Sequence, residues 1–114
     1  MFSQCALVHA RSVLPCQDSP AVKFTYEAVV EHPEELTALM SALLDKREGK
    51  ATYFKQHIPM PAYLVALAIG RLVSKPLGTN SNVWAEQEII EECAEEFSDT
   101  SKMLKTASDI CGPY

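Results

Sequence analysis

The stretch that most limits how this chain can fold is Y-L-V-A-L-A-I-G-R-L-V, residues 63–73. It is apolar on both faces until Arg71, and Pro59 and Pro61 prevent a helix from beginning earlier. We therefore predict a strand that needs a cover on each side. The rest of the chain offers one amphipathic helical region and a few strands, so one face or edge of this strand is expected to stay open. The sequence thus predicts that this chain is part of a larger protein.

Other segments show the period of two that is typical of half-buried strands. In A-V-K-F-T-Y-E-A-V-V, residues 21–30, apolar side chains alternate with polar ones. Residues 36–43 fit either a strand or a helix. The strand is favoured because the polar segment D-K-R-E-G-K then makes a hairpin to residues 51–58.

The C-terminal part of the sequence changes character. Residues 74–82 are rich in Pro, Gly, Ser and Asn and are predicted to be a linker. Beyond them, apolar residues recur at steps of three and four, with capping residues in S-D-T-S and a stop at C-G-P-Y. The predicted fold class is α+β. A partial antiparallel or mixed β-sheet domain occupies residues 1–78, and a linker with two C-terminal amphipathic helices occupies residues 79–114.

Charge and hydropathy exclude some classes of protein. The net charge is −5, and it divides into +1 over residues 1–78 and −6 over residues 79–114. No basic stripe is present to bind a nucleic-acid backbone, so no nucleic-acid partner is expected. No run reaches the roughly 18 apolar residues of a membrane span, and no secretory signal is recognisable. We expect a soluble, cytoplasmic chain.

The sequence contains no recognisable catalytic or metal-binding motif. H-E-x-x-H, G-x-S-x-G, the P-loop and G-x-G-x-x-G are all absent, so we assign no catalytic residue. The cysteines form no C-x-x-C pair and have no histidine at ligand spacing, so we assign no metal ligand. They are expected to be reduced, with Cys5 in a strand, Cys16 in a turn, and Cys93 and Cys111 at helical core positions. A nucleophilic Cys16 with a histidine base stays open as the less favoured alternative.

The segment H-A-R-S-V-L-P-C-Q-D-S-P resembles an active-site loop but can be explained as a scaffold. Pro15 and Pro20 fix φ and restrict the residues before them, which predicts a stiff corner between two strands. Asp18 can accept hydrogen bonds from turn amides, and Arg11 can reach Asp18. Cys16 fits a small buried position in the turn. We interpret these five residues as a structural corner.

A family resemblance covers essentially the whole chain. The pattern Q-x(6)-R-x(3)-P-C-x-D-x-P-x-V-K, which begins at Gln4, resembles the N-terminal β domain of leukotriene A(4) hydrolase and aminopeptidase B type zinc metallopeptidases. L-T-A-L-M-S-A, I-P-M-P-A-Y-L-V-A-L-A-I-G-R-L-V-S, V-W-A-E and E-E-F-S-D-T-S-K-M-L-K follow in the family's order, and G-P-Y ends the chain. The resemblance implies the end of the N-terminal β domain and the first helices of the catalytic domain.

The resemblance also implies an activity for the full-length family. Its members are zinc metallohydrolases in which a metal-activated water attacks the first peptide bond, and the leukotriene branch also opens a lipid epoxide. The aminopeptidase B branch prefers basic N-terminal residues. The family's H-E-x-x-H and G-x-M-E-N motifs do not occur in residues 1–114. We therefore expect these residues alone to bind no zinc and to be inactive.

The resemblance places one substrate contact within this chain. The segment before the corner contributes to peptide binding in the family, and it maps onto Gln4, Cys5 and Ala6. Gln4 matches the family, although a purely structural hydrogen bond is an alternative for its amide. Ala6 departs from the family because the leukotriene branch usually has a second glutamine there. A rival hypothesis is a non-catalytic interaction module that pairs with a partner, or with itself, through an open strand edge.

Overall fold

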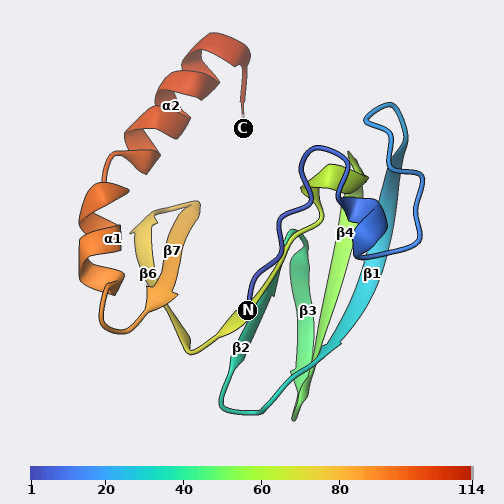
Figure 1. Cartoon of the computed structure of the whole chain (residues 1–114). Coiled ribbons are helices and arrows are strands. Elements are labelled where there is room, and N and C mark those ends of the chain that lie inside the picture. The colour runs from blue at the N-terminus through green and yellow to red at the C-terminus, as the bar shows by residue number, and fades with distance from the viewer. Residues whose placement is uncertain (114) are drawn as a thin grey trace. The chain divides into compact units, whose positions relative to one another are not determined.

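The alternating segment forms strand β1 (Lys23–Glu31), whose residues are exposed and half-buried in turn. In the computed structural model, which describes residues 1–113, β1 pairs with β4 (Ala51–Pro61) and β4 pairs with β3 (Leu43–Glu48). Both pairings are antiparallel and give a sheet in the order β1-β4-β3 (Figure 1). The central strand β4 therefore carries backbone hydrogen bonds on both of its edges.

The predicted hairpin joins β3 to β4. Glu48 pairs with Ala51, and Gly49 and Lys50 form the turn between them. Gly49 has φ = 56°, a conformation that glycine adopts without a Cβ penalty. A two-residue turn with glycine first is the arrangement of a type II′ hairpin, whose twist suits the flanking strands. The glycine in D-K-R-E-G-K thus fixes where the chain reverses.

A second sheet contains two strands, β2 (Thr37–Met40) and β5 (Leu67–Gly70), which pair antiparallel. The first residues of the chain add to it. The Ser3 amide donates to the Leu67 carbonyl at 2.8 Å, and the Ser3 hydroxyl accepts from the Leu67 amide at 2.9 Å. The sequence-based expectation of an open edge is therefore wrong for β5, because the N-terminal residues lie along it.

Ser41 connects the two sheets. Its carbonyl oxygen accepts hydrogen bonds from the Tyr26 hydroxyl on β1 and from the Gln56 amide on β4, both at 3.0 Å. Its hydroxyl oxygen accepts from the backbone amide of Ala66, at 2.9 Å, just before β5. A single residue between β2 and β3 thus has partners in both sheets, which fixes how the chain leaves the second sheet after β2 and returns to the first sheet at β3.

The prediction of one strand over residues 63–73 is wrong. The structure has a short 3-10 helix, η2 (Ala62–Leu64), then β5, then a bend at Arg71 and a new strand, β6 (Leu72–Gly78). The 3-10 turn is closed by a hydrogen bond from the Val65 amide to the Ala62 carbonyl, at 3.0 Å. Arg71 is exposed, which is consistent with a charged side chain at the point where the strand breaks.

The predicted linker over residues 74–82 is also wrong, because most of it forms a hairpin. Strand β6 pairs antiparallel with β7 (Ser81–Glu86), and Pro76 lies within β6. A two-stranded ribbon tolerates a proline, because an edge strand need not donate at every position. Gly78 faces Ser101, whose hydroxyl donates to the Leu77 carbonyl at 2.9 Å. A Cβ at position 78 would overlap that hydroxyl, so the glycine serves a packing contact.

The chain is helical from Ile90 to Cys111 and bends between α1 (Ile90–Glu96) and α2 (Thr100–Cys111). Ile90 and Ala94 are buried on α1, which packs against β6 and β7. Cys111 is exposed, so its predicted core position is wrong. The recurrence of apolar residues at steps of three and four correctly indicated a helix. It did not show whether other described residues cover the apolar face of that helix.

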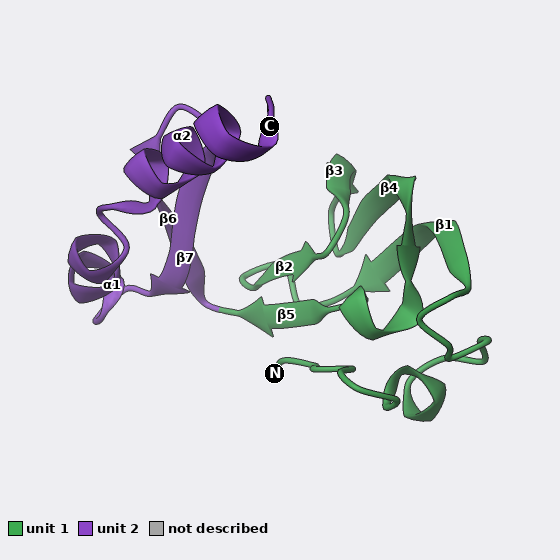
Figure 2. Ribbon diagram, turned by 90° about the horizontal axis from the view of Figure 1, so that it is seen from above, with its two compact units in different colours: residues 1–70 green, residues 71–114 purple. Residues whose placement is uncertain are grey.

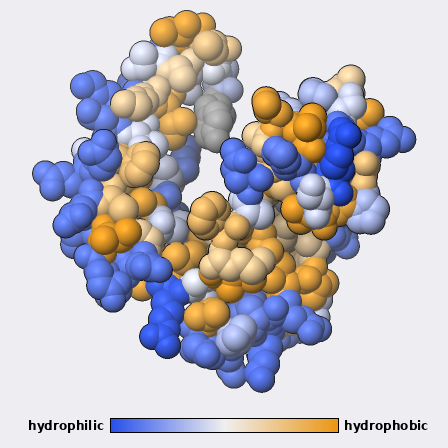
Figure 3. All heavy atoms as spheres, in the orientation of Figure 1, coloured by the Kyte–Doolittle hydropathy of each residue, from blue (hydrophilic) through white to orange (hydrophobic). Residues whose placement is uncertain are grey.

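The chain divides into two compact units, Met1–Gly70 (unit 1) and Arg71–Tyr114 (unit 2) (Figure 2). The predicted order, a mostly antiparallel sheet followed by a helical region, is confirmed. The proposed domain boundary after residue 78 stays a prediction, and the compact units divide eight residues earlier. Apolar side chains remain on the surface (Figure 3). Among residues 1–113, none of the helices is both long and apolar enough to cross a membrane.

A buried histidine links β1 to β4 at one end of the pair. His32 is 5% exposed, and its Nε2 lies 2.8 Å from the Thr52 hydroxyl. Its Nδ1 lies 2.8 Å from the Pro33 carbonyl oxygen, which can only accept. The proton therefore sits on Nδ1, and Nε2 accepts from Thr52.

We expect Thr52→Val to destabilise the fold. Valine keeps the volume but leaves His32 Nε2 buried without a donor, which lowers the free energy of unfolding by about 1 to 2 kcal/mol. The measurement is the urea midpoint followed by circular dichroism. Thr25→Val, at an exposed position of β1, is the matched control and is expected to change little. Equal effects of the two substitutions would contradict the assigned role of His32.

Candidate functional site

The candidate site is built on a small buried cluster in unit 1. Cys5, Ala10 and Ala62 are each no more than 1% exposed and pack together. Ala62 follows directly on β4, and Ala10 begins the 3-10 helix η1 (Ala10–Ser12). The partly buried side chains that pack against this cluster are Leu14, Cys16 and Phe24. The end of β4 thus anchors the N-terminal segment.

Residues 4–6 begin a turn instead of the predicted strand. Gln4 is exposed, Cys5 is buried and Ala6 is half-buried. The chain turns immediately after Cys5, and the His9 amide donates to the Cys5 carbonyl at 3.1 Å. The peptide bond between Ala6 and Leu7 is cis. The prediction of a strand at Cys5 is therefore wrong, and the buried Cys5 side chain holds a turn whose Gln4 side faces solvent.

The corner contains the predicted contact between Arg11 and Asp18. The Asp18 Oδ2 accepts from the backbone amide and from the Nε of Arg11, both at 3.1 Å, and Arg11 Nη2 donates to the Asp18 carbonyl at 3.1 Å. The Asp18 side chain is only 4% exposed, whereas that of Arg11 is 61% exposed. A nearly buried carboxylate therefore closes the loop with two hydrogen bonds, and the Asp18 backbone carbonyl adds a third.

The surroundings of the corner differ from the prediction in one respect. Strand β1 follows it, but η1 and a turn, not a second strand, precede it. Pro15 and Pro20 are exposed, which fits residues that restrict the backbone without filling the core. Cys16 packs against the cluster but is only half-buried, whereas the sequence predicted a buried position in the turn.

The thiol at the centre of the site is poorly suited to act as a nucleophile. Burial raises the pKa of Cys5 above its ordinary value, and the negative charges of Asp18 and of a Cys16 thiolate raise that pKa further. A thiol is nucleophilic only as the thiolate. Cys5 therefore stays mostly protonated near neutral pH, and in the reduced site its side chain packs against Ala10 and Ala62.

The described residues hold no metal centre. Across residues 1–113, no three His, Cys, Asp or Glu side chains come together in a geometry that could hold a metal ion. His9 and His57 are exposed, and His32 is fully engaged with Thr52 and Pro33. Sequence reasoning missed the structural role of His32. Its position directly before Pro33, at the end of a predicted strand, was the available signal.

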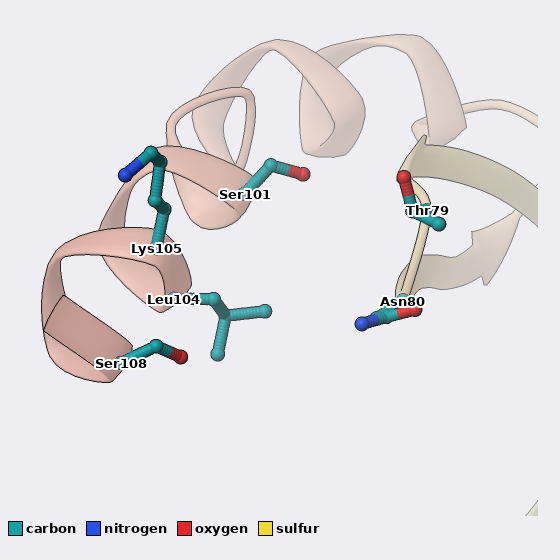
Figure 4. A pocket seen from close by; sticks show the side chains of 6 residues that line it. All are labelled: Thr79, Asn80, Ser101, Leu104, Lys105 and Ser108. Atoms are coloured by element: carbon teal, nitrogen blue, oxygen red, sulfur yellow. The ribbon is translucent and has the colours of Figure 1, made fainter. Parts of the chain in front are cut away.

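A separate hollow of about 220 Å³ lies in unit 2, between the β6-β7 turn and α2. In Figure 4 the Leu104 side chain points across it towards Asn80, whereas Lys105 points away. The Lys105 ammonium instead pairs with Asp109 at 2.8 Å. The hollow therefore lacks a free charged group to fix a ligand, and we assign it no function.

Comparison with known proteins identifies the family. A sequence model of the peptidase M1 N-terminal domain matches residues 1–64, which is more than half of the chain. The chain belongs to the peptidase M1 family. This M1 chain is 47% identical over 121 residues to leukotriene A-4 hydrolase of Xenopus laevis and 43% identical over 116 residues to aminopeptidase B of Mus musculus. Both matches take in the whole M1 chain, which spans only 20% and 18% of these relatives.

Solved structures agree with the sequence match. The M1 chain superposes on the yeast leukotriene A(4) hydrolase in complex with bestatin with a TM-score of 0.88 and 39% identity. The native Saccharomyces cerevisiae enzyme gives a TM-score of 0.86 at the same identity. Each comparison covers 96% of the M1 chain and 17% of the other chain. The predicted resemblance is confirmed in both sequence and fold.

The corner predicts a specific loss of stability. Asp18→Ala leaves the backbone amide and Nε of Arg11 without their carboxylate partner, and we expect the free energy of unfolding to fall by about 2 kcal/mol. Asp45→Ala, which removes a half-exposed partner of Lys55, is the matched control and is expected to cost about 0 to 1 kcal/mol. Urea unfolding measures both. A loss in Asp18→Ala no larger than in the control would show that the corner is not a stabilising contact.

Proposed function

We propose that this chain is part of a zinc-dependent aminopeptidase or leukotriene epoxide hydrolase. Residues 1–78 would supply the end of the N-terminal β domain, and residues 79–114 the start of the catalytic domain. The main support is that the whole chain is similar in sequence to relatives from both branches, and that 96% of it is similar in fold to the yeast leukotriene A(4) hydrolase. The chain spans about a fifth of those relatives, so activity is proposed for the whole protein and not for these residues alone.

Within that protein we propose that residues 4–6 contact the peptide substrate. The cluster of Cys5, Ala10 and Ala62 fixes the turn, and the Arg11 and Asp18 bridge holds the segment that follows. Gln4 is exposed, and among residues 1–113 its side-chain amide has no hydrogen-bond partner. An amide can both donate to and accept from a peptide end. Ala6 offers only a methyl group, so Gln4 carries the polar contact.

The residues present do not fit a zinc ion. A catalytic zinc site needs three protein ligands around an open position, and the described residues bring no such group together. The H-E-x-x-H motif does not occur in residues 1–114. When bound in the whole protein, zinc would activate the attacking water. The part proposed for this chain is to position the substrate.

The proposal is tested by a chimaera in which residues 1–114 replace the matching stretch of the Xenopus laevis leukotriene A-4 hydrolase. We expect it to hydrolyse a tripeptide. Gln4→Ala is expected to raise KM by about fivefold with a smaller change in kcat, because it removes one hydrogen bond to the substrate. Gln17→Ala, at another exposed glutamine, is the control and is expected to leave KM unchanged.

The chimaera separates the two parts of the proposal. A folded chimaera without peptidase activity would contradict the assignment of the chain to this enzyme. Activity that is insensitive to Gln4→Ala would contradict the substrate contact alone. The 114 residues by themselves are expected to bind no stoichiometric zinc, and zinc near one equivalent by elemental analysis would show a site that the described residues do not reveal.

A second candidate function is an interaction module that pairs through strand β3. All six residues of β3 are exposed, including Leu43 and Leu44, and in the described part of the chain β3 pairs only with β4. An unpaired edge is a template for another strand. Antiparallel pairing of two copies about the centre of β3 would place Asp45 opposite Lys46, which is favourable for the charges.

For this candidate we expect reversible self-association of the 114-residue chain in sedimentation velocity. Lys46→Glu would place like charges opposite each other at the edge and shift the chain towards monomer. Lys50→Glu makes the same charge change in the hairpin turn, outside the strand. It is the control and should not shift the chain towards monomer. A monomer at every concentration, or an equal effect of the two substitutions, would rule out pairing through β3.

A further inference from the structure

Two of the four cysteines lie in one cluster of unit 1. Cys5 packs with Ala10 and Ala62, and Cys16 packs against the same cluster from the corner. Both are free thiols. The negative charge of a Cys16 thiolate is also one of the causes that raise the pKa of Cys5. The polar contact proposed for the peptide is made by Gln4 and uses neither thiol.

The fold brings these thiols together through several independent contacts. The turn after Cys5 is closed by the hydrogen bond from the His9 amide, and η1 follows directly. The Arg11 and Asp18 bridge then ties Asp18, two residues after Cys16, to η1. The two thiols are therefore neighbours in the folded chain for a structural reason, and unfolding would separate them.

The two thiols differ in access to solvent. Cys16 is half-buried and can meet a small dissolved oxidant, whereas Cys5 is 1% exposed. An oxidant would therefore react first at Cys16, and the buried Cys5 would then react with the oxidised Cys16 sulfur. The other cysteines, Cys93 and Cys111, belong to unit 2. They provide an internal comparison for reactivity.

We propose that Cys5 and Cys16 form a thiol-oxidation site, at which hydrogen peroxide drives a reversible intramolecular disulfide. The Cys16 sulfur attacks one peroxide oxygen, the O–O bond breaks, and the products are a sulfenic acid and one water. A minor fraction of Cys5 that has lost its proton then attacks the Cys16 sulfur as the thiolate and displaces hydroxide, which combines with that proton to give a second water, so this second step is slow. The thiols lose two electrons and two protons, and one peroxide becomes two waters. A small thiol such as glutathione reverses the reaction.

The consequence for substrate binding rests on the proposed function. Cys5 is the central residue of the turn that would contact the peptide, and its side chain anchors that turn. A disulfide would change how the turn is anchored and would therefore change KM for the peptide in the chimaera, with recovery after reduction. The formation of the disulfide itself needs neither substrate nor zinc, so the two proposals can fail separately.

The test is peptide mapping of the 114-residue chain with Cys93→Ser and Cys111→Ser, which leaves only the two clustered thiols. After treatment with hydrogen peroxide, the chain is alkylated and digested with trypsin without reductant. Trypsin cuts after Arg11 and Lys23, so Cys5 and Cys16 fall in different peptides, residues 1–11 and 12–23. We expect these two peptides as a linked pair, lighter by two hydrogen atoms than their sum and separated by reductant.

Two controls decide whether the fold brings the thiols together. The pair should form at least several-fold faster in buffer than in concentrated urea, and Cys16→Ser should abolish it. Equal rates in buffer and in urea would overturn the proposal, because proximity along the chain would then suffice. It would also be overturned if Cys16 were oxidised to the sulfinic acid while Cys5 stayed unlinked, or if links formed only between chains.

Discussion

The pairing of β4 on both of its edges is the constraint on which the rest of unit 1 depends. It aligns β1 and β3, and Gln56 on β4 donates to Ser41, where the chain passes from β2 of the second sheet to β3 of the first. The same strand runs on into Ala62, against which Cys5 and Ala10 pack. The turn at residues 4–6 is therefore anchored to the best-bonded strand of the unit. This is why a segment with little secondary structure of its own can hold a defined place.

The elements that the sequence predicted well are those with local causes. The alternation in β1 reflects one covered face, and Gly49 marks the hairpin because few other residues adopt its φ. The failures have non-local causes. Residues 63–73 are apolar throughout, so their composition could not show the bend at Arg71. Residues 74–82 have the composition of a linker, but Gly78 is needed there for contact with Ser101, a partner in a distant helix.

The candidate site also has some features that the sequence could predict and others that it could not. The bridge between Arg11 and Asp18 could be predicted because the two residues are close along the chain and oppositely charged. The burial of Cys5 could not, because its partner Ala62 lies far along the sequence. The pairing of His32 with Thr52 was missed for the same reason. The family resemblance identified the turn as a site of interest, and the structure supplies the physical basis for its position.

The corner and the cluster together hold the turn at residues 4–6 as part of the folded unit. Native-state amide hydrogen exchange tests this most directly, because the amides of His9 and Arg11 donate to Cys5 and Asp18 only in this arrangement. We expect both amides to exchange slowly, and to become exposed to exchange in the same opening event as the amides of β4. Exchange of His9 and Arg11 at the rate of an unfolded chain, while β4 stays protected, would contradict it.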